Sequence, residues 1–163
     1  MDIASILTRV QSYPTRHVTV TGGEPLAQKA CRDLLVDLCD LGCDVSLETS
    51  GALDISGVDA RVSRIVDLKT PASGEVERNC WPNVLLLAPH DEVKFVLADE
   101  ADYNWARKML EEHQLPQRCP VLFSPVWGQV EPSQLADWIL RDGLQVRMQV
   151  QLHKLLWKEA KGR

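Results

Sequence analysis

The hydrophobic and polar positions of this chain follow two different periods in alternation. Short runs rich in β-branched residues, with apolar and polar positions alternating, are typical of strands and occur at 17–21, 44–49, 63–68, 92–98, 120–125 and 145–151. Between them, apolar residues recur at the spacing of amphipathic helices, at 2–12, 25–41, 54–60, 100–114 and 132–142. Strands that alternate with helices predict right-handed crossovers and a parallel sheet.

The stretch at 18–25, Val-Thr-Val-Thr-Gly-Gly-Glu-Pro, joins a predicted strand to a predicted helix. Paired glycines allow positive φ angles and let a ligand approach main-chain N–H and C=O groups that a Cβ atom would shield. Pro25 suits the first turn of a helix. A tight strand-to-helix turn explains this pattern, but Glu24 adds a carboxylate at the mouth of the turn, which is a suitable acceptor for an ammonium group.

Composition favours an ordinary soluble globular protein. The 163 residues, of which 45% are hydrophobic and 25% charged, suffice for one domain spanning 1–163. The net charge of −5 argues against a nucleic-acid backbone as partner. Apolar runs fall short of the roughly 20 residues that cross a bilayer, and residues 1–5 lack the basic region of a signal peptide. We therefore expect a cytoplasmic protein that binds neither nucleic acid nor membrane.

The spacing of the five cysteines favours free thiols. Cys31 and Cys39 fall on the apolar stripe of a predicted helix, Cys43 follows three residues later, and Cys80 and Cys119 stand alone. An odd number of cysteines in a cytoplasmic protein does not indicate a disulfide framework. An iron–sulfur cluster needs thiolates gathered in one loop, so we expect no metal ligand in this chain.

Six motifs occur along this chain in the order in which one enzyme family carries them. They are Thr-Gly-Gly-Glu-Pro at 21–25, Glu-Thr-Ser-Gly at 48–51, Asp-Leu-Lys-Thr-Pro at 67–71, Asp-Glu-Val-Lys-Phe-Val at 91–96, Phe-Ser-Pro-Val at 123–126 and Gln-Val-Gln-Leu-His-Lys at 149–154. Together they resemble the 7-carboxy-7-deazaguanine synthases, which are radical S-adenosylmethionine (SAM) enzymes of queuosine and 7-deazapurine biosynthesis. The resemblance covers almost the whole chain.

An α/β fold follows from this resemblance, namely a partial (β/α) barrel of about six parallel strands from which the N-terminal unit of the family is missing. The polar residues support it independently, because they lie at or just past the C-terminal ends of predicted strands, where parallel α/β folds build their sites. These residues are Thr21, Glu24, Glu48, Ser50, Asp67, Lys69, Ser124, Gln151 and His153.

The SAM contacts that the resemblance implies are Gly22, Gly23, Glu24, Glu48, Ser50, Lys69, Ser124, Pro125 and Val126. The Gly-Gly-Glu motif would receive the methionine ammonium group, and the Ser-Pro-Val motif would line the adenosine pocket. Lys69 alternatively pairs with Asp67 at the barrel rim. A surface loop is the alternative place for Glu48 and Ser50.

Thr21, Gln151 and His153 resemble substrate contacts of the family. The implied substrate is 6-carboxy-5,6,7,8-tetrahydropterin, a ring rich in donors and acceptors with one carboxylate. An imidazole donates to a carboxylate or, when neutral, accepts from the pterin. Gln149, Gln151 and His153 would share one face of the last predicted strand, which favours a polar cavity.

The resemblance also implies a reaction and its cofactors. In the family, a reduced [4Fe–4S] cluster cleaves SAM to a 5′-deoxyadenosyl radical, and the substrate then loses hydrogen, rearranges, contracts its ring and releases ammonia. Family members bind Mg²⁺ and need an electron donor such as flavodoxin, and a homodimer is compatible with the chain. The family's cluster cysteines and Mg²⁺ residue precede the helix that begins here at Met1, so we expect this chain alone to be inactive.

Two other functions remain open at this point. A non-catalytic module would keep the SAM or pterin pocket and bind without turnover. An unrelated parallel α/β binding domain would require six ordered motifs to have arisen by chance.

Overall fold

The computed structural model of this chain describes residues 2–157, apart from the side chains of His153 and Leu155. Six parallel strands form one sheet in chain order. They are β1 (His17–Val20), β2 (Asp44–Thr49), β3 (Ser63–Leu68), β4 (Glu92–Leu97), β5 (Val121–Pro125) and β6 (Arg147–Met148). Within the described part, β1 and β6 each pair with one neighbour, so the sheet is not closed and the predicted partial barrel is confirmed.

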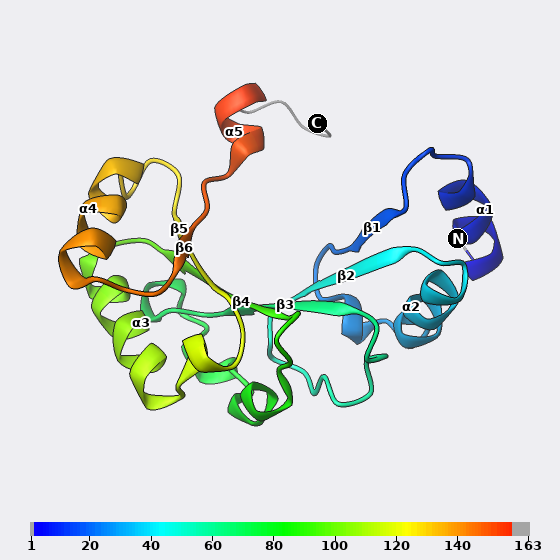
Figure 1. Cartoon of the computed structure of the whole chain (residues 1–163), viewed down its shortest axis with the longest axis horizontal. Coiled ribbons are helices and arrows are strands. Elements are labelled where there is room, and N and C mark those ends of the chain that lie inside the picture. The colour runs from blue at the N-terminus through cyan, green and yellow to red at the C-terminus, as the bar shows by residue number, and fades with distance from the viewer. Residues whose placement is uncertain (1, 158–163) are drawn as a thin grey trace.

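The sheet is curved, and most of the connecting helices lie on its outer side (Figure 1). The α-helices are α1 (Ile3–Gln11), α2 (Cys31–Asp40), α3 (Glu100–Glu112), α4 (Pro132–Asp142) and α5 (Leu152–Trp157). Short 3₁₀ helices lie at Pro25–Ala27, Pro71–Ser73, Val76–Arg78, Trp81–Leu86 and Leu115–Gln117. Over residues 2–157, no helix is long and apolar enough to cross a membrane.

Two predicted helices are wrong in whole or in part. The segment 25–41 forms a single 3₁₀ turn and then α2, because the backbone at Gln28 is extended, with φ −83° and ψ 120°. The segment 54–60 forms turns. There the Asp54 side chain accepts hydrogen bonds from both the backbone N–H and the hydroxyl of Ser56. Such local side-chain bonds compete with the helical backbone pattern.

The last predicted strand, 145–151, is also too long. β6 ends at Met148, and the backbone N–H of Gln149 makes one more bond, to the carbonyl of Phe123 at 2.9 Å. In a parallel ladder the carbonyl of Gln149 would next accept from residue 125 on the neighbouring strand. That residue is Pro125, which has no N–H, so the ladder stops and α5 follows.

Alternate residues of the central strands face opposite sides of the sheet. In β2, β3 and β4, every second residue is buried, and the residues between them are half-buried or exposed. Leu47, Val66 and Phe95 belong to the buried set and form the core beneath the helices. The period of two places Asp67 and Lys94 on the opposite, concave face, where polar side chains can meet a ligand.

Arg64 and Asp91 form a buried ion pair between the start of β3 and the residue before β4. Asp91 is 0% exposed and Arg64 is 8% exposed. The Asp91 carboxylate accepts bonds from the Arg64 guanidinium and from the backbone N–H groups of Arg64 and Ala88. Burial by itself would raise the pKa of Asp91, but these bonds outweigh burial and lower it. The pair therefore fixes the register at this end of the sheet.

We expect Asp91→Asn to lower the free energy of unfolding by about 3–5 kcal/mol, because it leaves the Arg64 guanidinium buried without its counter-ion. The folded-state pKa of Asp91 is lowered, so the stability that its carboxylate contributes is present above the unfolded pKa of about 4. That contribution is lost as the pH falls through the lower folded value. Urea unfolding at several pH values measures both effects.

Asp137→Asn is the matched control, since Asp137 is exposed on α4. We expect it to change stability by no more than about 0.5 kcal/mol. Equal losses in the two variants would show that the buried ion pair does not stabilise the sheet.

Candidate functional site

Three cavities lie at the C-terminal edge of the sheet. One of about 300 Å³ is lined by Asp67, Lys69, Val96 and Val126, among others. A second, of about 450 Å³, lies on the concave face and is lined by Glu48, Lys94, Val96, Ser124, Gln149, Val150, Gln151 and Leu152. A third, of about 380 Å³, includes Pro125, Trp127, Val150 and Gln151. Shared lining residues make these three cavities neighbours, so one extended ligand or two adjacent ligands can occupy them.

The Gly-Gly turn after β1 has the backbone conformation that the sequence predicts. Gly22 has φ 101° and Gly23 has φ 52°, values that side chains other than that of glycine rarely adopt. Apart from the adjoining residues of the turn, no heavy atom of the described chain lies within 4 Å of the position that a Cβ atom would occupy at either glycine. The main chain of the turn is therefore open to a ligand.

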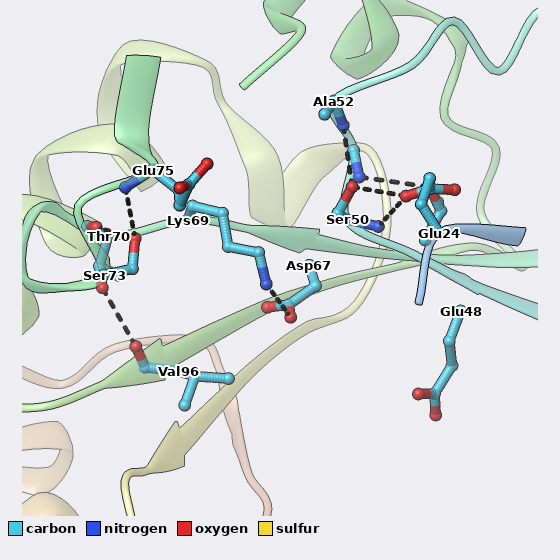
Figure 2. Close-up of polar contacts among 12 residues, drawn as sticks. Glu24, Glu48, Ser50, Ala52, Asp67, Lys69, Thr70, Ser73, Glu75 and Val96 are labelled. Carbon is cyan, nitrogen blue, oxygen red and sulfur yellow. Dashed lines mark hydrogen bonds and ion pairs between the residues drawn. The ribbon is translucent and has the colours of Figure 1, made fainter. Parts of the chain in front are cut away.

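Glu24 connects this turn to the end of β2. Its carboxylate accepts hydrogen bonds from the hydroxyl of Thr49 at 2.9 Å, the backbone N–H of Ser50 at 2.8 Å and the hydroxyl of Ser50 at 2.5 Å. The backbone N–H of Leu26 also donates to it, at 3.1 Å. Figure 2 shows the Glu24 and Ser50 side chains facing each other. We call these four residues the Glu24 network.

The Glu24 network keeps the carboxylate ionised. Burial by itself would raise the pKa of Glu24, but the bonds from Ser50, Leu26 and Thr49 outweigh burial and lower it. A carboxylate has about four lone-pair positions, and four protein donors already point at this one. The sequence predicts that the Glu24 carboxylate accepts from an ammonium group. In the structure, this carboxylate already accepts hydrogen bonds from the protein itself.

Lys69 pairs with Asp67, as the alternative interpretation of the sequence predicts. Its ammonium lies 2.7 Å from Oδ2 of Asp67 (Figure 2). The side chain of Asn79 fixes the Lys69 backbone, accepting from its N–H and donating to its carbonyl, both at 2.8 Å. Oδ1 of Asp67 is buried and has no hydrogen-bond partner within the described part of the chain.

Glu48 and Ser50 lie at the C-terminal edge of the sheet, which we call the site edge, rather than in a surface loop. Glu48 lies on β2, and Ser50 follows the strand directly. The Glu48 carboxylate points away from Glu24 and Ser50 (Figure 2) and lines the concave cavity. The hydroxyl of Thr21 donates to it at 3.4 Å, so Thr21 and Glu48 lie together beside that cavity.

Ser124, Pro125 and Val126 divide among the three cavities. Ser124 and Pro125 are the buried end of β5; Ser124 lines the concave cavity and Pro125 the third. Val126 lines the first cavity, and its backbone N–H bonds to the carbonyl of Leu97 at 2.9 Å. These residues therefore lie where the cavities meet.

The C-terminal segment differs from its prediction. His153 lies on α5 and does not share a strand face with Gln149 and Gln151, and its side chain falls outside the described residues. Gln151 is half-buried and lines two of the cavities. Its Oε1 atom is buried with no partner among residues that the structure describes.

The cysteines in the described chain do not fit an iron–sulfur cluster. Burial raises the pKa of the Cys31 thiol, and it raises that of Cys119 to about 11, which disfavours the thiolate that binds iron. Across residues 2–157, no three His, Cys, Asp or Glu side chains come together as metal ligands would. No chemical step can therefore be assigned to a cluster held by these groups.

Three residues that lie in this region are absent from the set of site residues predicted from the sequence. Thr49 bonds Glu24, Asn79 fixes Lys69, and Lys94 lines the concave cavity. Lys94 carried a usable signal, because it is a charged residue at an alternate position of a β-branched strand. Thr49 lies within the Glu-Thr-Ser-Gly motif, but its bond to Glu24 is distant in sequence, and no local pattern marks Asn79.

The sequence is similar to curated enzymes along nearly all of its length. It is 46% identical to the 7-carboxy-7-deazaguanine synthase of Chlorobaculum tepidum, a match that covers 99% of this chain and 76% of that protein. The enzyme of the same name from Koribacter versatilis is 41% identical, with 99% and 79% covered. No protein-family model matches the sequence.

Solved structures share the fold. QueE from Escherichia coli matches with a TM-score of 0.65 at 20% identity, covering 92% of this chain and 62% of that one. SuiB from Streptococcus suis, solved with S-adenosylmethionine, matches with a TM-score of 0.61 at 11% identity, covering 90% and 40%. At these identities, the likeness extends to the arrangement of strands and helices.

We expect Glu24→Gln to loosen the Glu24 network, because the amide NH₂ group would face protein donors. The amide hydrogens of Leu26 and Ser50 should exchange with solvent about tenfold faster, which corresponds to the loss of one bond of about 1.4 kcal/mol. Hydrogen exchange followed by NMR measures this. Glu111→Gln, exposed on α3, is the control. Unchanged protection at Leu26 and Ser50 would contradict the role given to the carboxylate.

Proposed function

The chain belongs to the family of 7-carboxy-7-deazaguanine synthases, and from this premise we propose that its site edge binds SAM and 6-carboxy-5,6,7,8-tetrahydropterin. The proposed reaction contracts the pterin ring to 7-carboxy-7-deazaguanine with loss of ammonia. One observation carries most weight: motifs far apart in sequence converge on neighbouring cavities at one edge of the sheet. Named relatives favour this enzyme over a module that only binds.

In this proposal SAM lies along the Gly-Gly turn and extends into the first cavity, which Val126 lines. The open main chain of Gly22 and Gly23 receives the methionine ammonium, and Glu24 holds that main chain in place. Ser50 and Lys69 lie beside the methionyl and ribose groups. The apolar surface of Pro125 and Val126 contacts the adenosine, with Ser124 as a polar neighbour.

The pterin occupies the concave cavity in the same proposal. Thr21 and Glu48 would contact one end of the ring and Gln151 the other, since all three lie at that cavity or bond to its lining. His153 belongs to the proposed substrate contacts by family resemblance. The chain's own residues thus orient the ring against SAM and limit access of water.

The cofactors of the family would act beside these residues. When bound, a [4Fe–4S] cluster supplies the electron that cleaves SAM, and Mg²⁺ supplies a cation for the substrate. We also propose an electron donor such as flavodoxin and a homodimeric state. The described cysteines do not fit the cluster, so the roles assigned to this chain are binding and orientation.

We expect Glu24→Ala to weaken SAM binding about tenfold, because the open conformation of the Gly-Gly turn depends on the carboxylate, and hydrogen bonds to charged groups contribute about 1.5–3 kcal/mol each. Isothermal titration of the purified chain with SAM measures the dissociation constant. Glu111→Ala, at an exposed position of α3, should bind SAM as the parent does. Parental affinity in Glu24→Ala would remove the Gly-Gly-Glu turn from the proposed cofactor site.

A further inference from the structure

Lys94 is a half-buried cation on the sheet. It lies on the concave face of β4, in register with Asp67 of β3 and Leu122 of β5. The carboxylates on either side of it along the face already have cations: Asp67 pairs with Lys69, and Glu92 pairs with Arg147. Within the described part of the chain, Lys94 makes no ion pair.

An ammonium group withdrawn from water is costly unless an anion compensates it. Lys94 lines the cavity of about 450 Å³ together with Glu48, Ser124 and Gln151, a size within the ~300–1,000 Å³ range of ligand pockets. An anionic group of a ligand that enters this cavity would supply the missing partner. The cavity therefore offers a cation to an anionic group of a ligand, and the Glu48 carboxylate in the same lining offers an acceptor to an N–H group of that ligand.

Two buried acceptors near Lys94 also lack partners. Oε1 of Gln151, which lines the same cavity, and Oδ1 of Asp67, the residue in register with Lys94, accept no hydrogen bond from any described residue. Buried polar atoms are nearly always paired. Of these two residues, Gln151 lines the cavity together with Lys94, so a ligand in that cavity can offer it a ring N–H or an amino group. Among the described residues, the Lys94 ammonium and Oε1 of Gln151 both lack partners and belong to one cavity. Together they complement a nitrogen heterocycle that bears a carboxylate.

We propose that the Lys94 ammonium binds the carboxylate of the pterin substrate and that Gln151 accepts a hydrogen bond from its ring. This inference rests on the proposed function, since it names how the concave cavity recognises that substrate. Lys94 then determines specificity: it distinguishes a carboxylated pterin from a pterin without the carboxylate.

Equilibrium fluorescence titration with 6-carboxypterin and with pterin tests this assignment on the full chain. Chelator in the buffer removes divalent cations, so that any preference for the carboxylate comes from the protein. We expect the parent to bind 6-carboxypterin about tenfold more tightly than pterin, which corresponds to about 1.4 kcal/mol. Lys94→Gln should reduce this ratio to about twofold or less, whereas Lys94→Arg should keep most of it.

Lys108→Gln is the matched control, because Lys108 is exposed on α3 and its variant should keep the parental ratio. SAM affinity, measured in parallel, should not change in Lys94→Gln. A parental ratio in Lys94→Gln, or a parent that does not distinguish the two pterins, would overturn the role of Lys94 while leaving the proposed function in place. A parent that binds neither pterin would overturn the proposed function and this inference with it.

Discussion

The hydrogen bonds to the Glu24 carboxylate are the interaction on which the rest of the site depends. Strand β1 lies at the edge of the sheet and pairs only with β2 among the described strands, so the turn that follows it has little other support. The bonds from Leu26, Thr49 and Ser50 tie that turn to the end of β2. An anion with four donors can hold two glycines in conformations that no packing enforces.

The open sheet explains why the concave face can be polar. A closed eight-stranded barrel fills its interior with packed apolar side chains, whereas here the concave face carries Glu48, Asp67 and Lys94 beside a cavity. Charges that are half-buried in this way need partners. The chain itself supplies some of these partners, as Lys69 does for Asp67. The charged groups that have no partner in the described chain determine which charges and donors a ligand needs.

Local patterns predicted the parts of the fold that depend on local chemistry. The strands at 44–49 and 63–68 match β2 and β3 residue for residue, because alternate burial leaves a clear period of two. The predicted helix at 54–60 is wrong because the Asp54 side chain bonds to the backbone of Ser56. The predicted last strand is too long because Pro125 on the neighbouring strand ends the hydrogen-bond ladder. The motif at 21–25 singled out Glu24 as a candidate, but its partners Thr49 and Ser50 lie about 25 residues away, beyond the reach of any local pattern.

A double-mutant cycle between Glu24→Gln and Ser50→Ala, read as SAM dissociation constants, tests the central role of the Glu24 network most directly. If Glu24 acts through the end of β2, the second substitution costs little once the first is present. We then expect a coupling of about 1 kcal/mol or more between residues whose side chains are 2.5 Å apart. Additive effects of the two substitutions would contradict this account, because they would show that Glu24 and Ser50 contribute to binding independently.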